Sequence, residues 1–329
     1  MEKIDILMAT YNSEKYIRQQ IESILNQTYT NFRLIISDDC SKDSTREILK
    51  EYSQKDDRIV IFYQEKNLGY VGNFEFLLSK VQDNIYMFSD HDDVWLPTKV
   101  EKSYQKLQET NADLVFTDLE IVDKDLKTIY PSFNDYMKLT RKIKKFKSDY
   151  RLQYLYNCIT GCTLMAKKKF FDKILPLPRD SKYVIHDYWI GLVYALYGKV
   201  EYLNEPTIKY RQHGDNQVGT DKISHKFTKM EGVRNLFIDV KIQLFKTYVN
   251  HEDIFPDKLK SLNKKALHYY MDIQDKKIIN LKNWSVFHML YKNETVIYYL
   301  ENFIIMNLPI VGRLLFQIRH FILKILGKR

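Results

Sequence analysis

Short apolar runs alternate with longer helical segments along the first 120 residues, and this alternation restricts the possible folds more than any other feature. The apolar runs have the length of β-strands and lie at residues 4–9, 33–37, 59–63, 85–89 and 113–117. The segments between them carry apolar residues three or four positions apart, the spacing of an amphipathic helix. Strands regularly separated by helices form a mainly parallel sheet with helices on both faces, so an α/β fold is predicted.

The sequence changes character twice after this pattern. Residues 120–220 are mixed, with a hairpin expected at 120–130, a basic segment at 138–151 and a helix at 187–197. Beyond residue 220 the composition shifts to lysine, tyrosine, asparagine and isoleucine with helical spacing. We therefore expect an α/β domain at residues 1–220 and a mainly helical, basic C-terminal region at 221–329.

The formal net charge of +9 lies entirely in that C-terminal region, because residues 1–220 contain equal numbers of basic and acidic side chains. This asymmetry favours an anionic partner, either a nucleic acid or a lipid headgroup surface. The 25 tyrosines and 18 phenylalanines are scattered through strands and helices, so core packing explains most of them. No nucleic-acid partner is expected.

The longest apolar stretch, residues 303–326, is interrupted by proline, glycine and charged residues, unlike a membrane span of roughly 20 apolar residues. It can lie at a bilayer surface, or it can pack as a core or dimer helix. The basic segment 138–151 is either a solvated loop or a contact with an anionic membrane or a lipid-linked pyrophosphate. With three cysteines, no CxxC and no signal peptide, a cytoplasmic protein, peripheral on the inner face of the cell membrane, is expected.

Polar residues follow three of the predicted strands, at 10–12, 38–43 and 90–93. Ligands of parallel sheets bind outside the carboxyl ends of the strands. Asp90 and Asp92 offer hard oxygen ligands for Mg²⁺ or Mn²⁺, and the alternative is a solvated acidic turn. Because the chain has no GxGxxG and no P-loop motif, a cation held by carboxylates is the most economical way to bind phosphate.

Other candidate residues have a structural as well as a functional interpretation. Asp39 can accept a hydrogen bond from a base or a ribose hydroxyl, whereas Ser41 or Asp43 can simply cap the next helix. Asp187 lies at the start of an apolar helix, and the structural interpretation is that it does no more than cap that helix. A histidine such as His213 is more often a satisfied polar residue than a metal ligand.

Seven motifs can be read in order along residues 3–218. They are Thr10-Tyr11-Asn12, Asp38-Asp39-x-Ser41-x-Asp43-x-Thr45, Asn67-x-Gly69, SDHDDVWLP at 89–97, Gly161-Cys162, His186-Asp187-Tyr188-Trp189 and Tyr210-Arg211-x-His213-x-x-Asn216. Together they resemble inverting family 2 glycosyltransferases of the GT-A fold. The later motifs resemble the branch that contains rhamnosyltransferases and related surface-polysaccharide enzymes.

The resemblance implies a nucleotide-sugar site. Thr10, Tyr11, Asp39 and Asn67 match residues of the nucleotide-base pocket, with Asp39 as the partner of the pyrimidine N3–H. The implied donor is a nucleoside diphosphate sugar, dTDP-rhamnose first and UDP-glucose or UDP-galactose next. The implied acceptor is a glycan, lipid-linked, in bacterial surface-polysaccharide synthesis.

The resemblance also implies the reacting groups. Asp90 and Asp92 match the family's DxD motif, in which the second carboxylate binds Mn²⁺ or Mg²⁺ and the first faces the donor sugar or ribose. Asp93 lies beside them and is expected to contact donor or acceptor. Asp187 matches the general base of a single displacement with inversion, and His213 matches an additional metal ligand of some members.

The chain departs from the family pattern in two places, and two other functions compete. His91 replaces the commoner glutamine or serine within the DxD motif and could add a nitrogen ligand, while His186 replaces a glutamate. The motif also fits the phosphatase pattern DxDx[TV], although that motif follows the first strand of its fold. The third possibility is a non-catalytic protein that binds a sugar nucleotide or a membrane.

Overall fold

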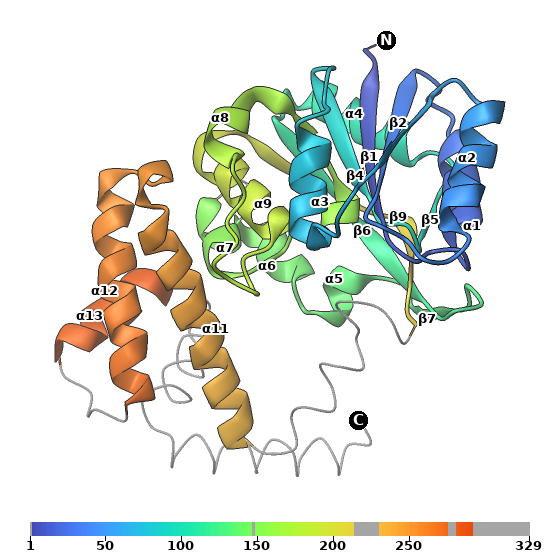
Figure 1. Cartoon of the computed structure of the whole chain (residues 1–329). Coiled ribbons are helices and arrows are strands. Elements are labelled where there is room, and N and C mark those ends of the chain that lie inside the picture. The colour runs from blue at the N-terminus through green and yellow to red at the C-terminus, as the bar shows by residue number, and fades with distance from the viewer. Residues whose placement is uncertain (1, 147–148, 214–229, 276–280, 292–329) are drawn as a thin grey trace, which may run out of the picture. The chain divides into compact units, whose positions relative to one another are not determined.

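The computed structural model describes residues 2–146, 149–213, 230–275 and 281–291 (Figure 1). The chain divides into two compact units. The first contains Met1–Arg179 and Ile185–Asn216, and the second contains Asp180–Val184 and Gln217–Arg329. The expected boundary at residue 220 lies outside the described residues.

The first unit is built on one sheet of nine described strands in the order β3-β2-β1-β4-β8-β6-β9-β5, with β7 paired to β6. The strands are β1 (Ile4–Thr10), β2 (Phe32–Asp38), β3 (Ile59–Tyr63), β4 (Ile85–Ser89), β5 (Val94–Trp95), β6 (Leu114–Val122), β7 (Thr128–Tyr130), β8 (Leu164–Lys167) and β9 (Val200–Arg211). Strands β1 to β4 are mutually parallel, and β6 is parallel to β9. The prediction of a mixed, mainly parallel α/β sheet is confirmed.

Strand β8 was not expected from the sequence. The four-residue strand β8 inserts between β4 and β6 and runs antiparallel to both. Only three of its residues pair with each neighbouring strand. A segment this short shows no recognisable alternation of apolar and polar residues in the sequence. Its position brings the preceding 3-10 turn, Gly161–Thr163, next to the end of β4.

Helices cover both faces of this sheet (Figure 1). The helices of the first unit are α1 (Ile17–Leu25), α2 (Thr45–Lys55), α3 (Gly69–Leu78), α4 (Lys99–Glu109), α5 (Phe133–Tyr136), α6 (Thr140–Phe146), α7 (Tyr150–Leu155), α8 (Phe171–Ile174) and α9 (His186–Tyr197). The expected hairpin at 120–130 is formed by β6 and β7, and the helix expected at 187–197 is α9.

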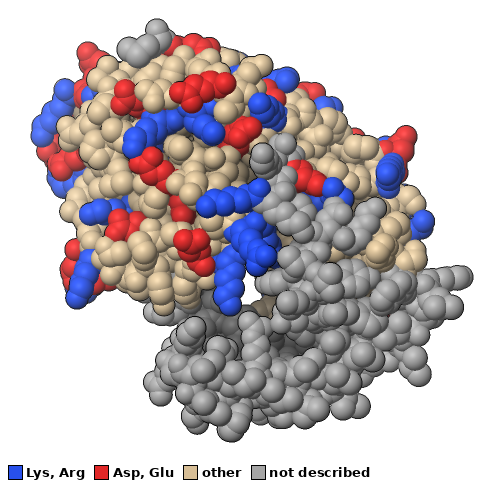
Figure 2. All heavy atoms as spheres, turned by 180° about the vertical axis from the view of Figure 1, so that it is seen from behind, with Lys and Arg blue, Asp and Glu red and all other residues tan. Residues whose placement is uncertain are grey.

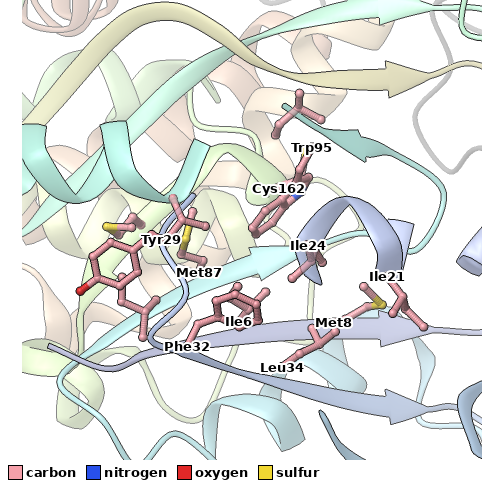
Figure 3. Close-up of a cluster of buried hydrophobic side chains, with 14 of the residues drawn as sticks. Ile6, Met8, Ile21, Ile24, Tyr29, Phe32, Leu34, Met87, Trp95 and Cys162 are labelled. Carbon is pink, nitrogen blue, oxygen red and sulfur yellow. The ribbon is translucent and has the colours of Figure 1, made fainter. Parts of the chain in front are cut away.

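One core cluster of the first unit lies between the sheet and helices α1, α2 and α4. Alternate residues of a strand point to the same face, so Ile6 and Met8 of β1 lie in one cluster with Ile21 and Ile24 of α1 (Figure 3). All four are fully buried. Burial of such side chains stabilises the fold by about 1.5–3 kcal/mol each, and it fixes the strand ends that carry the polar residues.

The second unit is helical in its described part, as predicted. It contains α11 (Met230–Asn250), α12 (Asp257–Gln274) and α13 (Leu281–Tyr291). Its core is aromatic, and the hydroxyls of Tyr270 and Tyr291 lie 2.6 Å apart within it. Asp180 belongs to this unit and accepts hydrogen bonds from Thr247 at 3.2 Å and Asn250 at 2.7 Å.

Among the described helices, none is both long and apolar enough to cross a membrane. The interfacial segment expected at residues 303–329 lies outside the described residues.

Candidate active site

The polar turns meet at one edge of the sheet because β2, β1 and β4 are parallel neighbours. In the register of the sheet, Thr10 lies opposite Asp38, and Met8 lies opposite Ser89. The backbone N–H of Asp39 donates to the carbonyl of Thr10 at 2.9 Å. The turns after the three strands are therefore neighbours, as the sequence indicated.

The two adjacent aspartates after β2 have different surroundings. Asp38 is buried and accepts a 2.6 Å hydrogen bond from Arg46, so its charge is compensated within the fold. The Oδ1 of Asp39 accepts from the backbone N–H of Leu68 at 2.6 Å, and the amide of Asn67 donates to the Asp39 carbonyl at 3.0 Å. Asp39 and Asn67 thus lie together at the sheet edge.

The other two residues expected in this pocket differ in exposure. Thr10 is buried, and its hydroxyl is hydrogen-bonded to Ser13. Tyr11 follows it directly and is 45% exposed, which leaves its ring open to a ligand. The turn is held by Asn12, whose side chain accepts from the backbone N–H of Lys42 at 2.8 Å.

Asp92 and His213 lie in direct contact, although 121 residues separate them. Oδ2 of Asp92 is 2.9 Å from Nε2 of His213. Burial alone would raise the pKa of Asp92, but the charge of His91 and the contact with His213 outweigh it and hold that pKa below its ordinary value. The ring of Tyr16 packs on His213 at 4.8 Å between centroids. An ionised carboxylate oxygen and an imidazole nitrogen so placed fit a borderline divalent cation such as Mn²⁺.

A second acidic group lies beside this pair. Ligand atoms of Asp90, Asp93 and Cys162 all lie within 4.8 Å of one another. Burial, together with the charges of Asp92 and Asp187, raises the pKa of Asp90 to about 7. Burial also raises the pKa of Asp93 and of the Cys162 thiol well above their ordinary values. A buried thiol is a poor partner for Mg²⁺ or Mn²⁺, so Asp92 and His213 fit such an ion better.

Arg211, at the end of β9, connects the acidic turn to two other segments. Its backbone N–H donates to Oδ1 of Asp93 at 3.1 Å, and its Nε donates to the carbonyl of Asp92 at 2.8 Å. Its two terminal nitrogens donate to the carbonyl of Lys124 and the side chain of Gln19, both at 2.6 Å. Arg211 is buried, so its guanidinium holds the acidic turn in place from the interior of the protein.

Asp187 is buried near the start of α9 and is held by donors from three segments. Oδ2 accepts from the backbone N–H of Gly161 at 3.0 Å. Oδ1 accepts from the N–H of Tyr188 at 2.6 Å and from Asn157 at 3.4 Å. Burial raises the pKa of Asp187 to about 6. The contact with Gly161 reaches outside the helix, so capping alone does not describe this carboxylate.

The two histidines that depart from the family pattern are engaged elsewhere. Nδ1 of His91 lies 3.2 Å from the carbonyl of Ala9, which ties the acidic turn to β1. His186 is buried and stacks on Phe74 at 4.1 Å, and burial lowers its pKa to about 3. A neutral, stacked imidazole at this position supports α9 by packing.

Sequence reasoning gave no role to Arg211, Asn157 or Cys162. The last two contact the acidic residues only because the Gly161–Thr163 turn and α7 are folded against β4 and α9. Arg211 and Cys162 did lie within two of the seven motifs, but the motifs assigned neither of them a role. The acidic turn follows the fourth strand of the chain, which does not match the phosphatase pattern.

A mixed sheet with a DxD turn at its strand ends and a buried carboxylate facing that turn defines a sugar-nucleotide-dependent glycosyltransferase. Residues 5–175, about half of the chain, match the family described as Glycosyl transferase family 2. The protein belongs to glycosyltransferase family 2.

Curated relatives and solved structures agree with this assignment. An uncharacterized glycosyltransferase of Rickettsia typhi is 30% identical over 220 residues, which are 66% of each chain. The dTDP-rhamnosyl transferase RfbG of Shigella flexneri is 29% identical over 69% of this chain and 79% of its own length. The first curated relatives are thus matched over only about two thirds of their length.

Two solved structures share the fold. Staphylococcus aureus TarS, residues 1–349, solved with UDP-GlcNAc, has a TM-score of 0.56 at 16% identity and is matched over 92% of this chain and 80% of its own. The mannosyltransferase PcManGT of Pyrobaculum calidifontis, solved with GDP-Man and Mn²⁺, has a TM-score of 0.55 at 12% identity, over 89% and 76%. At these identities the likeness establishes the GT-A-like fold.

Proposed function

We propose that this enzyme transfers a hexose, rhamnose first among the candidates, from a nucleoside diphosphate donor to a lipid-linked glycan with inversion. The observation that carries the proposal is the buried Asp187, which has a pKa near 6 and faces the acidic turn that contains Asp90 and Asp92. A general base of that pKa is ionised at neutral pH and still basic enough to accept a proton from an attacking hydroxyl.

The nucleotide would bind at the edge formed by β1 and β2. Asp39 has one oxygen committed to Leu68 and a second that can accept the N3–H of a pyrimidine base. The exposed ring of Tyr11 offers a stacking surface for the base, and Thr10 and Asn67 line the same edge. This arrangement suits a uridine or thymidine nucleotide.

Asp92 and His213 are the residues that would hold a divalent cation, because their ligand atoms already lie 2.9 Å apart. Bound there, Mn²⁺ or Mg²⁺ would stabilise the negative charge of the departing nucleoside diphosphate. Asp90 would face the donor sugar or ribose. Asp93 lies beneath the turn, and Arg211 holds it in place.

Transfer then requires deprotonation of the acceptor hydroxyl. Asp187 would accept that proton while the donations from Gly161 and Tyr188 hold its carboxylate in one orientation. Attack on the face of the sugar opposite the nucleotide inverts the anomeric configuration, with no covalent intermediate. Asn157 would support the same orientation.

The choice of sugar and acceptor draws on relatives. RfbG is named as a dTDP-rhamnosyl transferase, and a Bacillus subtilis relative, 33% identical over 122 residues, as a putative teichuronic acid biosynthesis glycosyltransferase. The first name supports rhamnose as the sugar, and the second supports a glycan as the acceptor, which we propose to be lipid-linked. The basic C-terminal region 221–329 would hold the enzyme at the inner face of the membrane.

A panel of nucleotide sugars tests the proposal. Each would be incubated with Mn²⁺ or with chelator, with and without a lipid-linked acceptor, and the released nucleotide and the product configuration would be measured. We expect metal-dependent turnover of dTDP-rhamnose with inversion. Turnover of a different donor would correct the sugar, and retained configuration would remove Asp187 from the role of base.

A further inference from the structure

The catalytic unit exposes large apolar side chains next to its β6–β7 hairpin. Ile129 and Tyr130 of β7 are 45% and 40% exposed, and Met137, which follows α5, is 38% exposed. The rings of Tyr130 and Tyr136 lie 4.3 Å apart between centroids, so β7 and α5 form one continuous surface. Among the described residues of this unit, Ile129 and Met137 are the exposed large aliphatic side chains.

Basic residues flank this apolar group in the sequence. Lys127, Lys138, Arg141 and Lys144 are all exposed, and in the described part of the chain none of the four forms an ion pair. The exposed acids between them are Asp125 and Asp135, so positive charge predominates. Figure 2 shows lysine and arginine side chains gathered near the centre of one face of the molecule. We call Lys127, Ile129, Tyr130, Met137, Lys138, Arg141 and Lys144 the hairpin surface.

The hairpin surface is joined directly to the candidate active site. Tyr130 pairs with Ile121 of β6, and Val122 pairs with Arg211 of β9. Arg211 in turn donates to the carbonyl of Lys124 in the hairpin and to the carbonyl of Asp92 in the acidic turn. Figure 1 shows β7 and α5 at the end of the sheet toward which β1 runs. A partner bound to the hairpin surface therefore lies beside the edge that holds the polar turns.

We infer that the hairpin surface docks on an anionic lipid bilayer. Aliphatic and tyrosine side chains with flanking cations match the two layers of a membrane interface, because the apolar groups enter the headgroup boundary and the cations pair with lipid phosphates. Nucleic acid would satisfy the cations but would leave Ile129 and Met137 exposed to water. The inference rests on the proposed function in one respect: docking on the bilayer would bring a lipid-linked acceptor within reach of Asp187.

The test measures lipid binding of the full chain without any substrate. Wild-type protein would be co-sedimented with phosphatidylcholine vesicles that do or do not contain phosphatidylglycerol. Two variants would be compared, Lys138→Glu/Arg141→Glu for the charge and Ile129→Ser/Met137→Ser for the apolar contact. The matched control is Lys3→Glu/Lys50→Glu, which makes the same change of charge at two exposed lysines elsewhere in the first unit.

We expect both hairpin variants to bind anionic vesicles at least about tenfold more weakly than wild type, whereas the control binds as wild type does. All four residues are exposed, so thermal midpoints should stay unchanged. Wild-type binding by either hairpin variant would overturn the inference, and so would an equal loss in the control, because net charge alone would then explain the effect.

A second measurement separates this inference from the proposed function. Donor hydrolysis without vesicles should be the same in wild type and both hairpin variants, since none of the four residues touches the candidate active site. Transfer to an acceptor embedded in vesicles should fall in parallel with lipid binding. Hydrolysis that is absent from every protein would refute the proposed function and leave the lipid-binding result intact.

Discussion

Replacement of Asp187 by asparagine should abolish transfer and at the same time stabilise the protein. Burial raises the pKa of Asp187 from its ordinary value of 3.8 to about 6. Because each pKa unit corresponds to about 1.4 kcal/mol, the ionised carboxylate lowers the free energy of unfolding by about 3 kcal/mol at neutral pH. Asparagine has the same shape and no charge, so it avoids this penalty.

Part of that gain is lost to hydrogen bonding. The carboxylate accepts from the N–H groups of Gly161 and Tyr188 with different oxygens, and an amide can accept with only one of its two ends. Leaving one N–H without an acceptor costs about 1–2 kcal/mol. The net stabilisation is therefore about 1–2 kcal/mol, which corresponds to about 2–8 °C in the melting temperature of a unit of this size.

The dependence of this stabilisation on pH tests whether the buried charge of Asp187 is its cause. Because the pKa of Asp187 is raised in the folded protein, this side chain costs no stability below pH about 4, where it is protonated in both the folded and the unfolded chain. The cost develops as the pH rises through about 6 and the buried carboxyl ionises. Thermal unfolding followed by circular dichroism should show the gain of Asp187→Asn at pH about 7.5, and a much smaller gain at pH about 4. Asp172→Asn, at an exposed carboxylate of the same unit, should change neither value.

Two results would refute this reasoning. A variant that is less stable than wild type at both pH values would mean that the carboxylate is a structural contact and not a strained base. Appreciable transfer by the variant, measured as nucleotide release with acceptor present, would mean that another group accepts the proton.

Three further predictions concern other positions. Asp92→Asn should reduce transfer by at least about 100-fold, because it removes the charge that holds the cation, and wild-type activity should disappear in EDTA and return with Mn²⁺; full turnover of metal-free wild type would contradict this. Asp39→Ala should raise the donor KM about tenfold with kcat nearly unchanged, since the base contact is remote from the reacting carbon; steady-state kinetics would reveal the opposite pattern if Asp39 were at the reacting centre. Gly198→Ala should lower the free energy of unfolding by about 1–3 kcal/mol, because the new Cβ would lie 2.8 Å from the Phe170 ring and 3.0 Å from Asp113; an unchanged urea midpoint would show that the site can relax.

Much of the sheet follows from local periodicity. Strands β3 and β4 have the predicted bounds, because each is a continuous apolar run bounded by polar residues. Strand β6 continues to Val122, beyond the predicted end at 117, because the register shifts around Asp118 and pairing with β9 resumes. Helix α4 begins at Lys99, and the N–H of Leu96 just before it is bound to the carbonyl of Thr207 in β9. At both boundaries the chain pairs with the distant strand β9.

The candidate site was predictable as far as parallel geometry reaches. The turns of Asp39 and Asp90 had to share an edge, and they do. Spacing alone could not distinguish Asp38 from Asp39, and the choice of Asp39 rested on the family resemblance. The physical distinction is the guanidinium of Arg46, which reaches back from α2 to Asp38. It could not show the contact of Cys162 with the acidic turn either, because strand β8 was not predicted.

The hydrogen bonds of Arg211 have a consequence for synthesis of the protein on the ribosome. Strands β1 to β4 and their helices are contiguous in sequence, so they can pair as soon as residue 89 has emerged. The acidic turn directly after β4 remains without its anchor until more than 120 further residues have been made, because its partners Arg211 and His213 come last. A nascent or truncated chain that ends before this point can fold a sheet, but it lacks the contacts that hold Asp92 and Asp93. The donor site is therefore completed late, and a fragment that retains only the N-terminal half of the first unit should be inert toward nucleotide sugars.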